Sequence, residues 1–283
     1  MILPQLGRLD NMRPAALDAR TVYIHDDHRW VVPLIFHAQE SGRLPVPCKL
    51  VCLDRHHDAL PPDRERLRAL RDARRAGLTG ASVLNLCAEV LSPHDDDWIP
   101  AAMELGLLSD AVVLGGEGVF SRQALTDFTD HTGARHRIEL TGHLGPELAA
   151  IGRFGNLLRR GQEELLWNIF DWMVAPDGRL GFRPGAPPLA LSIDLDYFVI
   201  PWDTFRLPWP EEVYRGYFLT PSDQPALEGA TARDILRQLI DRAGLVAVAR
   251  EAGHCGGESK AAAVFADLNR LLLDGRLRLL PAE

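Results

Sequence analysis

Cysteine is scarce in this sequence, and long apolar runs are missing from it. Four cysteines, at positions 48, 52, 87 and 255, are spread over 283 residues, which is too few and too scattered for a disulfide framework. No stretch of about 18 uninterrupted apolar residues occurs, so no transmembrane helix is expected. The first twenty residues contain acids and lack the apolar core of a signal peptide. These absences favour a cytoplasmic protein with no membrane partner.

Positive charge is also in deficit. The chain has 31 lysines and arginines against 39 aspartates and glutamates, a formal net charge of −8. Proteins that bind nucleic acid are usually basic, so no nucleic-acid partner is expected. The apolar fraction of 46% and the charged fraction of 25% are those of a globular protein and exclude a disordered, collagen-like or coiled-coil chain. A chain of this length can fold without disulfide or metal cross-links, and we expect one domain over residues 1–283.

Short apolar runs alternate with helical patterns along the chain. The runs predict strands over residues 21–25, 49–54, 81–86, 110–115, 136–140, 188–196 and 245–250. The helical patterns cover residues 30–41, 61–76, 95–108, 146–173, 231–243 and 259–274. Strands that alternate with helices pair in parallel, and nearly continuous apolar strands are covered on both faces. The predicted fold class is therefore α/β, a three-layer αβα domain with a doubly wound, mostly parallel sheet. Residues 199–225, rich in proline and aromatic side chains, are expected to form an irregular insertion.

Acids and histidines gather where the predicted strands end. The sequence HDDH ends the first strand at residues 25–28, DRHHD ends the second at 54–58, and DLD ends the longest at 194–196. Ligands of open parallel sheets bind beyond these carboxyl ends. Residues at i, i+2 and i+4 of an extended chain point the same way. We therefore expect Asp54, His56 and Asp58 to share one side, and Asp194 and Asp196 to share another.

Paired carboxylates at the end of a buried strand repel each other and lose hydration unless a cation lies between them. Carboxylate oxygens and imidazoles together suit Mn, Fe, Co or Zn, including bridged pairs of such ions. Each acid alone could instead cap the helix that follows it. The presence of both D-x-H-x-D and D-x-D in one chain favours a metal site.

The ordered set formed by residues 27–28, 54–58 and 192–196 resembles the motifs of the arginase/agmatinase and histone-deacetylase-like superfamily, the ureohydrolases. The likeness spans roughly residues 20–255. Residues 25–28 and the pattern Asn85…Pro100-Ala101…Gly106 resemble more closely a ureohydrolase-related family. Some members of that family are peptide arginases, which convert arginine side chains of ribosomally made precursor peptides to ornithine.

The resemblance implies two Mn²⁺ ions held by six ligands. One ion would bind His28, Asp54, Asp58 and Asp194. The other would bind Asp54, His56, Asp194 and Asp196, so that Asp54 and Asp194 bridge. Manganese follows from the resemblance alone, because these ligand types also admit iron and zinc. His57 follows as in the deacetylase-like pattern, and either a catalytic role or a side chain pointing away is open to it.

Further candidates surround this ligand set. Glu251 follows an apolar run like the late arginase strand that ends near a pocket glutamate, and a carboxylate can make two parallel hydrogen bonds with a guanidinium. Asp58 would hold the nucleophile and pass its proton to the leaving amine. His254 is either a proton shuttle or a plain loop residue. Glu117 is a weaker candidate for substrate binding, and Tyr197 either walls a substrate pocket or lies in the core.

One departure from the family points to the substrate. Arginases for free arginine follow D-x-H-x-D with a loop of Asn, Ser and Thr that grips the amino-acid head group, whereas residues 59–62 here are Ala-Leu-Pro-Pro. The expected partner is therefore an arginine-containing precursor peptide, which is hydrolysed to ornithine and urea. The alternatives are a free-arginine or agmatine ureohydrolase, a deacetylase-like amidohydrolase, and a non-catalytic peptide-binding member. Nothing in the sequence indicates the oligomeric state.

Overall fold

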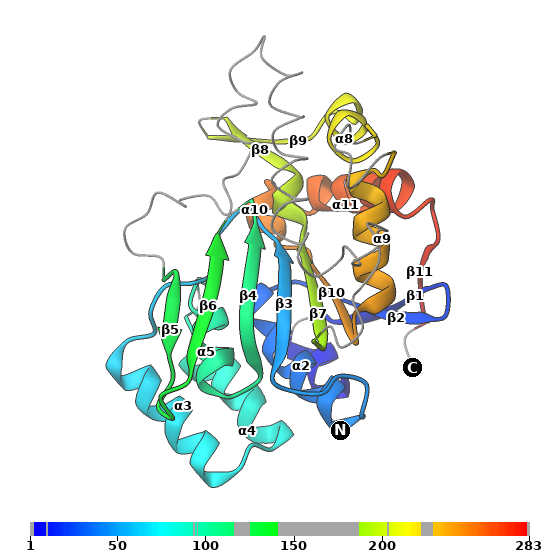
Figure 1. Ribbon diagram of the computed structural model, residues 1–283. Helices are drawn as coiled ribbons and strands as arrows, with labels where there is room; N and C mark the ends of the chain where they lie inside the picture. The colour runs from blue at the N-terminus through cyan, green and yellow to red at the C-terminus, as the bar shows by residue number, and fades with distance from the viewer. Residues whose placement is uncertain are drawn as a thin grey trace.

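The centre of the fold is a nine-stranded sheet, seen in a computed structural model (Figure 1). The model describes residues 3–9, 11–92, 94, 96–115, 125–140, 187–202, 204–221 and 229–281. The strands in spatial order are β11 (Leu277–Leu279), β1 (Arg13–Leu17), β2 (Arg20–His25), β10 (Leu245–Ala249), β7 (Leu189–Asp194), β3 (Cys48–Leu53), β4 (Leu108–Leu114), β6 (Arg135–Leu140) and β5 (Asp127–Thr129). The six strands from β2 to β6 run parallel, and β1, β11 and β5 add antiparallel edges.

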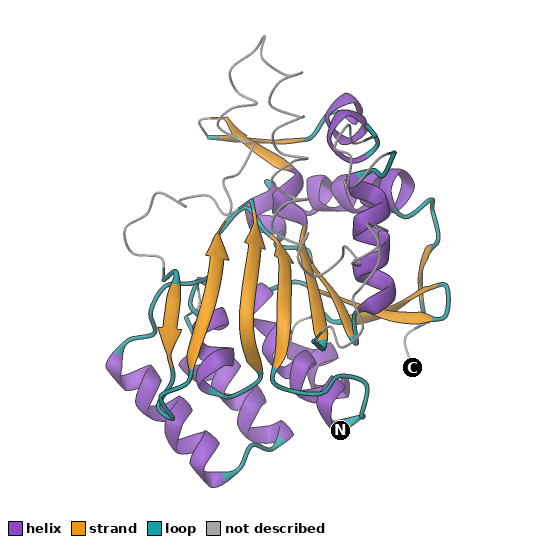
Figure 2. Ribbon diagram, in the orientation of Figure 1, coloured by secondary structure: helices purple, strands orange, loops and turns teal. Residues whose placement is uncertain are grey.

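Helices cover both faces of the sheet (Figure 2). One layer contains α1 (Leu3–Leu9), α2 (Val31–Glu40), α3 (Arg64–Ala76), α4 (Gly80–Asn85) and α5 (Trp98–Glu104). The other contains α8 (Glu211–Phe218), α9 (Ala232–Arg242) and α11 (Glu258–Asp267). In β3, Leu50 and Cys52 pack with the first layer, and Val51 and Leu53 with the second. This alternation of buried side chains confirms the predicted three-layer αβα fold.

The strands predicted from apolar runs are confirmed with one exception. Residues 81–86 were expected to form a strand but lie in α4 and the π-helical turn Leu86–Val90. The reason is a capping box, in which the Thr79 side chain accepts the Ser82 backbone N–H and the Ser82 side chain accepts the Thr79 backbone N–H. Such a box starts a helix and outweighs the apolar run.

Most predicted helices are present with different ends. The helix predicted to start at residue 61 starts at Arg64, because the Asp63 side chain caps it by accepting the Arg66 N–H. The helix predicted over 95–108 is shortened to α5, and the last helix ends in a π-helical turn, Leu268–Leu272. The helix predicted over 146–173 lies outside the described residues. No helix in the described part of the chain is long and apolar enough to cross a membrane.

The segment 199–225 is more regular than expected. It contains the antiparallel hairpin of β8 (Val199–Trp202) and β9 (Phe205–Pro208), followed by α8. Trp209 and Tyr214 anchor this segment in an aromatic cluster with Phe198. The hairpin lies above the carboxyl ends of the parallel strands, near the short helix α10 (Ala252–Cys255) (Figure 1).

Candidate metal centre

The predicted site residues meet over the carboxyl ends of four neighbouring strands. His28 follows β2, Asp54 follows β3, Asp194 ends β7, and Glu251 follows β10. These strands are adjacent in the order β2-β10-β7-β3. Residues that are up to 223 positions apart therefore meet at one edge of the sheet, as expected for ligand sites of open parallel sheets.

The first ligand set centres on the Nδ1 atom of His28. This nitrogen lies 3.0 Å from Asp54 Oδ2, 3.0 Å from Asp58 Oδ2 and 3.5 Å from Asp194 Oδ2, and all four side chains are buried. Among the described residues, neither His28 Nδ1 nor Asp194 Oδ2 has a hydrogen-bond partner. Three carboxylate oxygens directed at one buried nitrogen form an arrangement that a bound cation would stabilise.

The second ligand set lies beside the first. His56 Nδ1 is 3.1 Å from Asp196 Oδ2 and 3.9 Å from Asp54 Oδ1. Asp54 thus directs one oxygen toward His28 and the other toward His56. One oxygen each of Asp54, Asp194 and Asp196 lies within 4.8 Å of the others. The structure therefore brings all six predicted ligands together, with Asp54 and Asp194 placed to serve both sets.

The carboxylates converge through turns and not through strand alternation, which corrects the prediction from spacing. Strand β3 ends before Asp54, whose Oδ1 accepts the His56 N–H at 2.7 Å. Asp58 then has a φ of 49°, in the left-handed region that is rare for residues other than glycine. Strand β7 ends at Asp194, whose Oδ1 accepts the Asp196 N–H at 2.9 Å, and Asp196 lies in a 3₁₀-helix.

A second layer of contacts holds the ligands in place. His28 Nε2 lies 2.8 Å from Ser192 Oγ and 3.7 Å from Cys52 Sγ. Occupying Nε2 in this way leaves Nδ1 to face the carboxylates, which is how outer contacts orient histidine ligands. Burial raises the pKa of the Cys52 thiol to about 12, so this side chain remains a neutral thiol.

Two residues that contact the candidate ligands were not predicted from the sequence. The Trp98 indole Nε1 donates to Asp58 Oδ2 at 2.5 Å, and Arg55 Nε lies 3.4 Å from Asp196 Oδ2. Arg55 lies inside the DRHHD motif, so its pairing with an acid could have been considered. Trp98 is 40 residues from Asp58, and no motif around Trp98 in the sequence indicated this contact.

Burial and mutual repulsion shape the electrostatics of the first ligand set. Burial, followed by repulsion from Asp58, raises the pKa of Asp54. Burial and repulsion from Asp196 likewise raise the pKa of Asp194. Burial alone would lower the pKa of His28, but the nearby negative charge, including that of the Asp54 carboxylate, outweighs burial and raises this pKa. The cluster therefore retains protons that a bound cation would displace.

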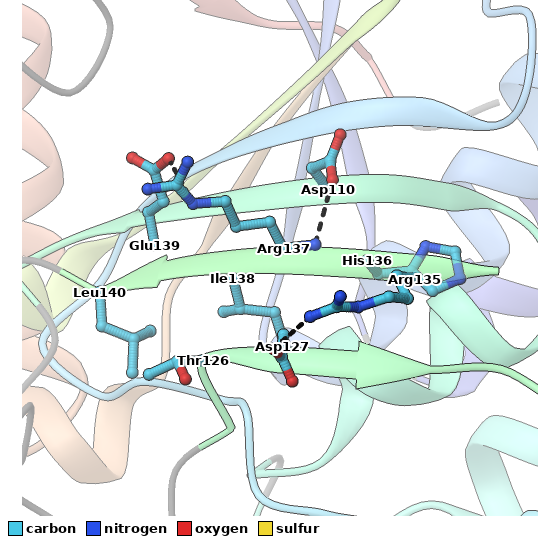
Figure 3. Close-up of a pocket in the computed structure, with 9 residues that line it drawn as sticks. All are labelled: Asp110, Thr126, Asp127, Arg135, His136, Arg137, Ile138, Glu139 and Leu140. Atoms are coloured by element: carbon cyan, nitrogen blue, oxygen red, sulfur yellow. Dashed lines mark hydrogen bonds and ion pairs between the residues drawn. The ribbon is translucent and has the colours of Figure 1, made fainter.

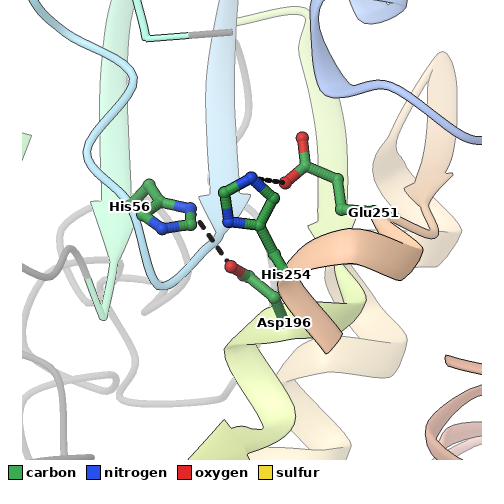
Figure 4. A group of neighbouring side chains, drawn as sticks. All are labelled: His56, Asp196, Glu251 and His254. Atoms are coloured by element: carbon green, nitrogen blue, oxygen red, sulfur yellow. Dashed lines mark ion pairs between the residues drawn. The ribbon is translucent and has the colours of Figure 1, made fainter. Parts of the chain in front are cut away.

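The open side of the cluster is formed by Glu251, His254 and His56 (Figure 4). The Glu251 side chain is 7% exposed, and its carboxylate accepts the His28 N–H at 3.3 Å and lies 3.9 Å from His254 Nε2. The side chains of His254 and His56 are 51% and 32% exposed, and their rings meet edge to face at 4.7 Å. Solvent therefore reaches the cluster from the side of these two imidazoles.

Glu251 is a buried carboxylate with an unusual charge environment. Burial, followed by repulsion from Asp196, raises its pKa to about 7. Among the described residues, no arginine or lysine forms an ion pair with it. Burial would lower the pKa of His56, but Asp196 outweighs this effect and raises it to about 10. Near neutral pH the open side thus combines a Glu251 carboxyl that is close to its pKa with a His56 imidazole that holds its proton, so the negative charge that a cationic ligand would meet there is that of ionised Glu251.

Three other predicted residues have different outcomes. The His57 Nδ1 accepts the Ala59 N–H at 3.2 Å, and among the described residues His57 belongs to none of the groups that could hold a metal ion. Tyr197 is buried in the core, where its hydroxyl donates to Tyr217 and its ring packs on Trp209. This burial fits the core alternative, and the substrate contact of Tyr197 stays a prediction. Glu117 lies outside the described residues.

A pocket elsewhere on the sheet includes none of these residues. It lies over β4, β6 and β5 (Figure 3). Its charged side chains pair with each other, Arg135 with Asp127 at 3.2 Å and Arg137 with Glu139 at 3.0 Å. This internal pairing leaves no concentration of one charge among the described residues that line the pocket.

Comparison with known proteins adds no assignment. A scan of the chain against protein-family models finds no match, and a search of curated proteins finds none either. The functional conclusion must therefore be drawn from the geometry and chemistry of the cluster.

Proposed function

We propose that this protein is a dinuclear metal-dependent hydrolase, with Mn²⁺ as the expected ion, that converts arginine side chains of a peptide to ornithine and urea. The observation that carries the proposal is the convergence of two imidazoles and four aspartates into two adjacent ligand sets that share Asp54 and Asp194. A structural metal site is usually closed around one ion, whereas this cluster has an open side.

The charge of the cluster fits two divalent ions. Five carboxylates lie together, and the buried Arg55 pairs with one of them. When every carboxyl is ionised, four negative charges remain, which two divalent cations would balance. The nitrogen and oxygen donors are of the kind that manganese, iron, cobalt and zinc accept.

The residues on the open side fit a guanidinium substrate. Bound divalent ions supply a hydroxide nucleophile near neutral pH. The arginine side chain stays cationic because its pKa exceeds about 12, so it needs a negative partner. Glu251 is that partner, since its carboxylate can accept two parallel charge-assisted hydrogen bonds from a guanidinium. This pairing would hold the guanidinium at the open side, next to the ligand sets.

Proton transfer can be assigned to two further residues. Asp58 would hold the proton of the nucleophile and pass it to the leaving amine, a general acid–base role. His254 lies between Glu251 and solvent, 3.9 Å from the Glu251 carboxylate and about half exposed. This distance and exposure support our proposal that His254 exchanges protons with solvent between turnovers.

The loop after the D-x-H-x-D motif supports a peptide in preference to free arginine. The Ala59 carbonyl accepts the Leu125 N–H at 2.9 Å, and the Leu60 N–H donates to the Asp96 carbonyl at 2.8 Å. Ala59 is buried. These backbone groups are satisfied within the protein, and the apolar side chains of residues 59–62 offer no polar group of their own to the α-amino and carboxylate groups of free arginine.

A substrate panel tests this proposal. The full chain, loaded with Mn²⁺, is incubated with an arginine-containing peptide, free arginine, agmatine and an acetyl-lysine peptide, and urea, acetate and peptide mass are measured. Urea from the peptide, with mass loss confined to arginine, is the expected result. Urea from free arginine or agmatine alone would reject the peptide substrate, and acetate would indicate a deacetylase-like amidohydrolase instead. An Asp54→Ala variant controls for contaminating activity.

A further inference from the structure

Trp98 contacts two residues of the first ligand set from within the protein. It is the first residue of α5 and is fully buried. Its indole N–H donates to Asp58 Oδ2 at 2.5 Å, and the same oxygen lies 3.0 Å from His28 Nδ1. Its ring centroid is 5.0 Å from that of the His28 ring. The indole is therefore both a hydrogen-bond donor to one ligand and a packing surface for another.

The start of α5 is joined to the loop that carries Asp58. The Ile99 N–H donates to the Asp58 carbonyl at 3.3 Å, and the Leu60 N–H donates to the Asp96 carbonyl at 2.8 Å. Asp97 in turn accepts from the Arg66 guanidinium at 2.9 Å, which fixes this turn to α3. The loop and the helix start thus form one connected unit behind the first ligand set.

Asp58 requires such support because of its own backbone. Its φ of 49° lies in the left-handed region, where a residue other than glycine is held at a cost by its surroundings. An aspartate in a strained turn has no helix or strand to set the direction of its side chain. The short hydrogen bond from the Trp98 indole reaches this side chain from the protein interior.

We propose that Trp98 is a positioning residue, which directs the Asp58 carboxylate into the first ligand set and thereby determines how tightly one of the two ions binds. A carboxylate oxygen has two acceptor positions, so Asp58 Oδ2 can accept the indole N–H and still bind a cation. Loss of outer contacts of this kind typically weakens metal binding about 10- to 100-fold. This inference rests on the metal centre of the proposed function and not on its substrate.

The test compares Trp98→Phe with Trp209→Phe in the full chain. Both tryptophans are buried, but among the described residues Trp209 Nε1 has no hydrogen-bond partner, so its replacement removes an indole without removing a ligand contact. Mn²⁺ binding is followed by calorimetry and by electron paramagnetic resonance. We expect Trp98→Phe to lose affinity for one ion about 10- to 100-fold and to show the signal of isolated Mn²⁺ where the wild type shows a coupled pair. Trp209→Phe should behave as the wild type.

Equal affinity for both ions in Trp98→Phe and the wild type would overturn the inference and leave Trp98 as a packing residue. Absence of Mn²⁺ binding by the wild type would instead reject the metal centre itself, so the two failures are distinguishable.

If Trp98→Phe does not fold, the six indole N–H signals of the wild type are followed by NMR during titration with Zn²⁺. One strongly shifted, slowly exchanging indole signal supports the inference, and six unchanged signals contradict it.

Discussion

Asp54 directs its two carboxylate oxygens at two different histidines, His28 and His56. Asp194 lies within reach of both sets and, like Asp54, is fully buried. A buried carboxylate is held at a cost unless a cation or several donors compensate its charge. At the scale of single residues, we therefore expect these buried carboxylates to lower the stability of the metal-free protein, a cost that functional sites commonly carry.

Asp194→Asn tests whether a buried carboxylate of the cluster lowers the stability of the metal-free protein. Burial and repulsion from Asp196 raise the pKa of Asp194, so its ionisation destabilises the metal-free fold progressively as pH rises above about 4, the ordinary aspartate value. An asparagine Oδ1 can still accept the Asp196 N–H. We expect the variant without metal to be about 1–2 kcal/mol more stable than the wild type at pH 7, with a smaller difference at pH 4, by urea denaturation in EDTA. A variant less stable than the wild type at both pH values would contradict this account.

Glu251→Gln tests the guanidinium partner. The substitution keeps the size of the side chain but removes the charge, so a charge-assisted pair becomes a neutral one. We expect kcat/KM for an arginine peptide to fall about 10²- to 10³-fold, as on removal of one oriented electrostatic contact, with unchanged manganese content. The measurement combines initial rates of urea release with metal analysis. Full activity would remove Glu251 from the mechanism, and loss of metal would make it a ligand.

At the scale of elements, the alternation of apolar runs and helices was enough to predict the six parallel strands. It failed at α4, where the capping box between Thr79 and Ser82 starts a helix within an apolar run. It also missed the edge strands β1, β5 and β11. These strands are three to five residues long and include exposed positions. They form because each pairs with the edge of a neighbouring strand. A local sequence pattern does not show that this edge is available.

The convergence of the six candidate ligands was predictable because each lies in a short motif at the end of a strand. Their geometry was not, since the turns after β3 and β7 bring the carboxylates together where spacing suggested extended chain. Trp98 was not predictable, because it reaches Asp58 from another element. Tyr197 follows Asp196 directly, yet the 3₁₀-helix turns its side chain into the aromatic core. Local sequence thus located the six candidate ligands, while the packing between elements determined the contacts that support them.

The β5–β6 turn offers a prediction that is independent of the metal centre. Asp130 accepts the Thr132 N–H at 2.8 Å, the Ala134 N–H at 3.0 Å and the Arg74 guanidinium at 2.9 Å. Burial would raise the pKa of Asp130, but the bonds with Thr132 and Arg74 outweigh it and hold this pKa well below its ordinary value. The stabilisation is present above about pH 4 and is lost as pH falls below that value.

Asp130→Asn should therefore lower the free energy of unfolding by about 1–3 kcal/mol at pH 7, and by less at pH 3. Urea denaturation at both pH values measures the effect. Asp127→Asn, in the same hairpin, is the matched control. Asp127 pairs with Arg135 at 3.2 Å, but both side chains are well exposed, at 62% and 78%, and such surface pairs contribute little. An equal loss in the two variants would contradict the assigned role of Asp130.

At the scale of the whole molecule, strand order creates the site. Strands β10 and β7 lie between β2 and β3, so the ends of four strands that are far apart in sequence are brought side by side. The two apolar layers of helices hold these strands rigidly, which keeps the buried carboxylates close despite their repulsion. Ions that bind only the folded chain should stabilise it as a whole.

The most direct measurement of the central claim is the metal content of the full chain by native mass spectrometry during titration with Mn²⁺. The account predicts two ions per chain in the wild type, and weakened binding of both ions in Asp54→Ala, because Asp54 serves both ligand sets. Thermal unfolding of the same samples should show a higher midpoint with metal for the wild type and a smaller rise for Asp54→Ala. A wild-type chain that binds no ion, or that saturates at one, would contradict the dinuclear centre.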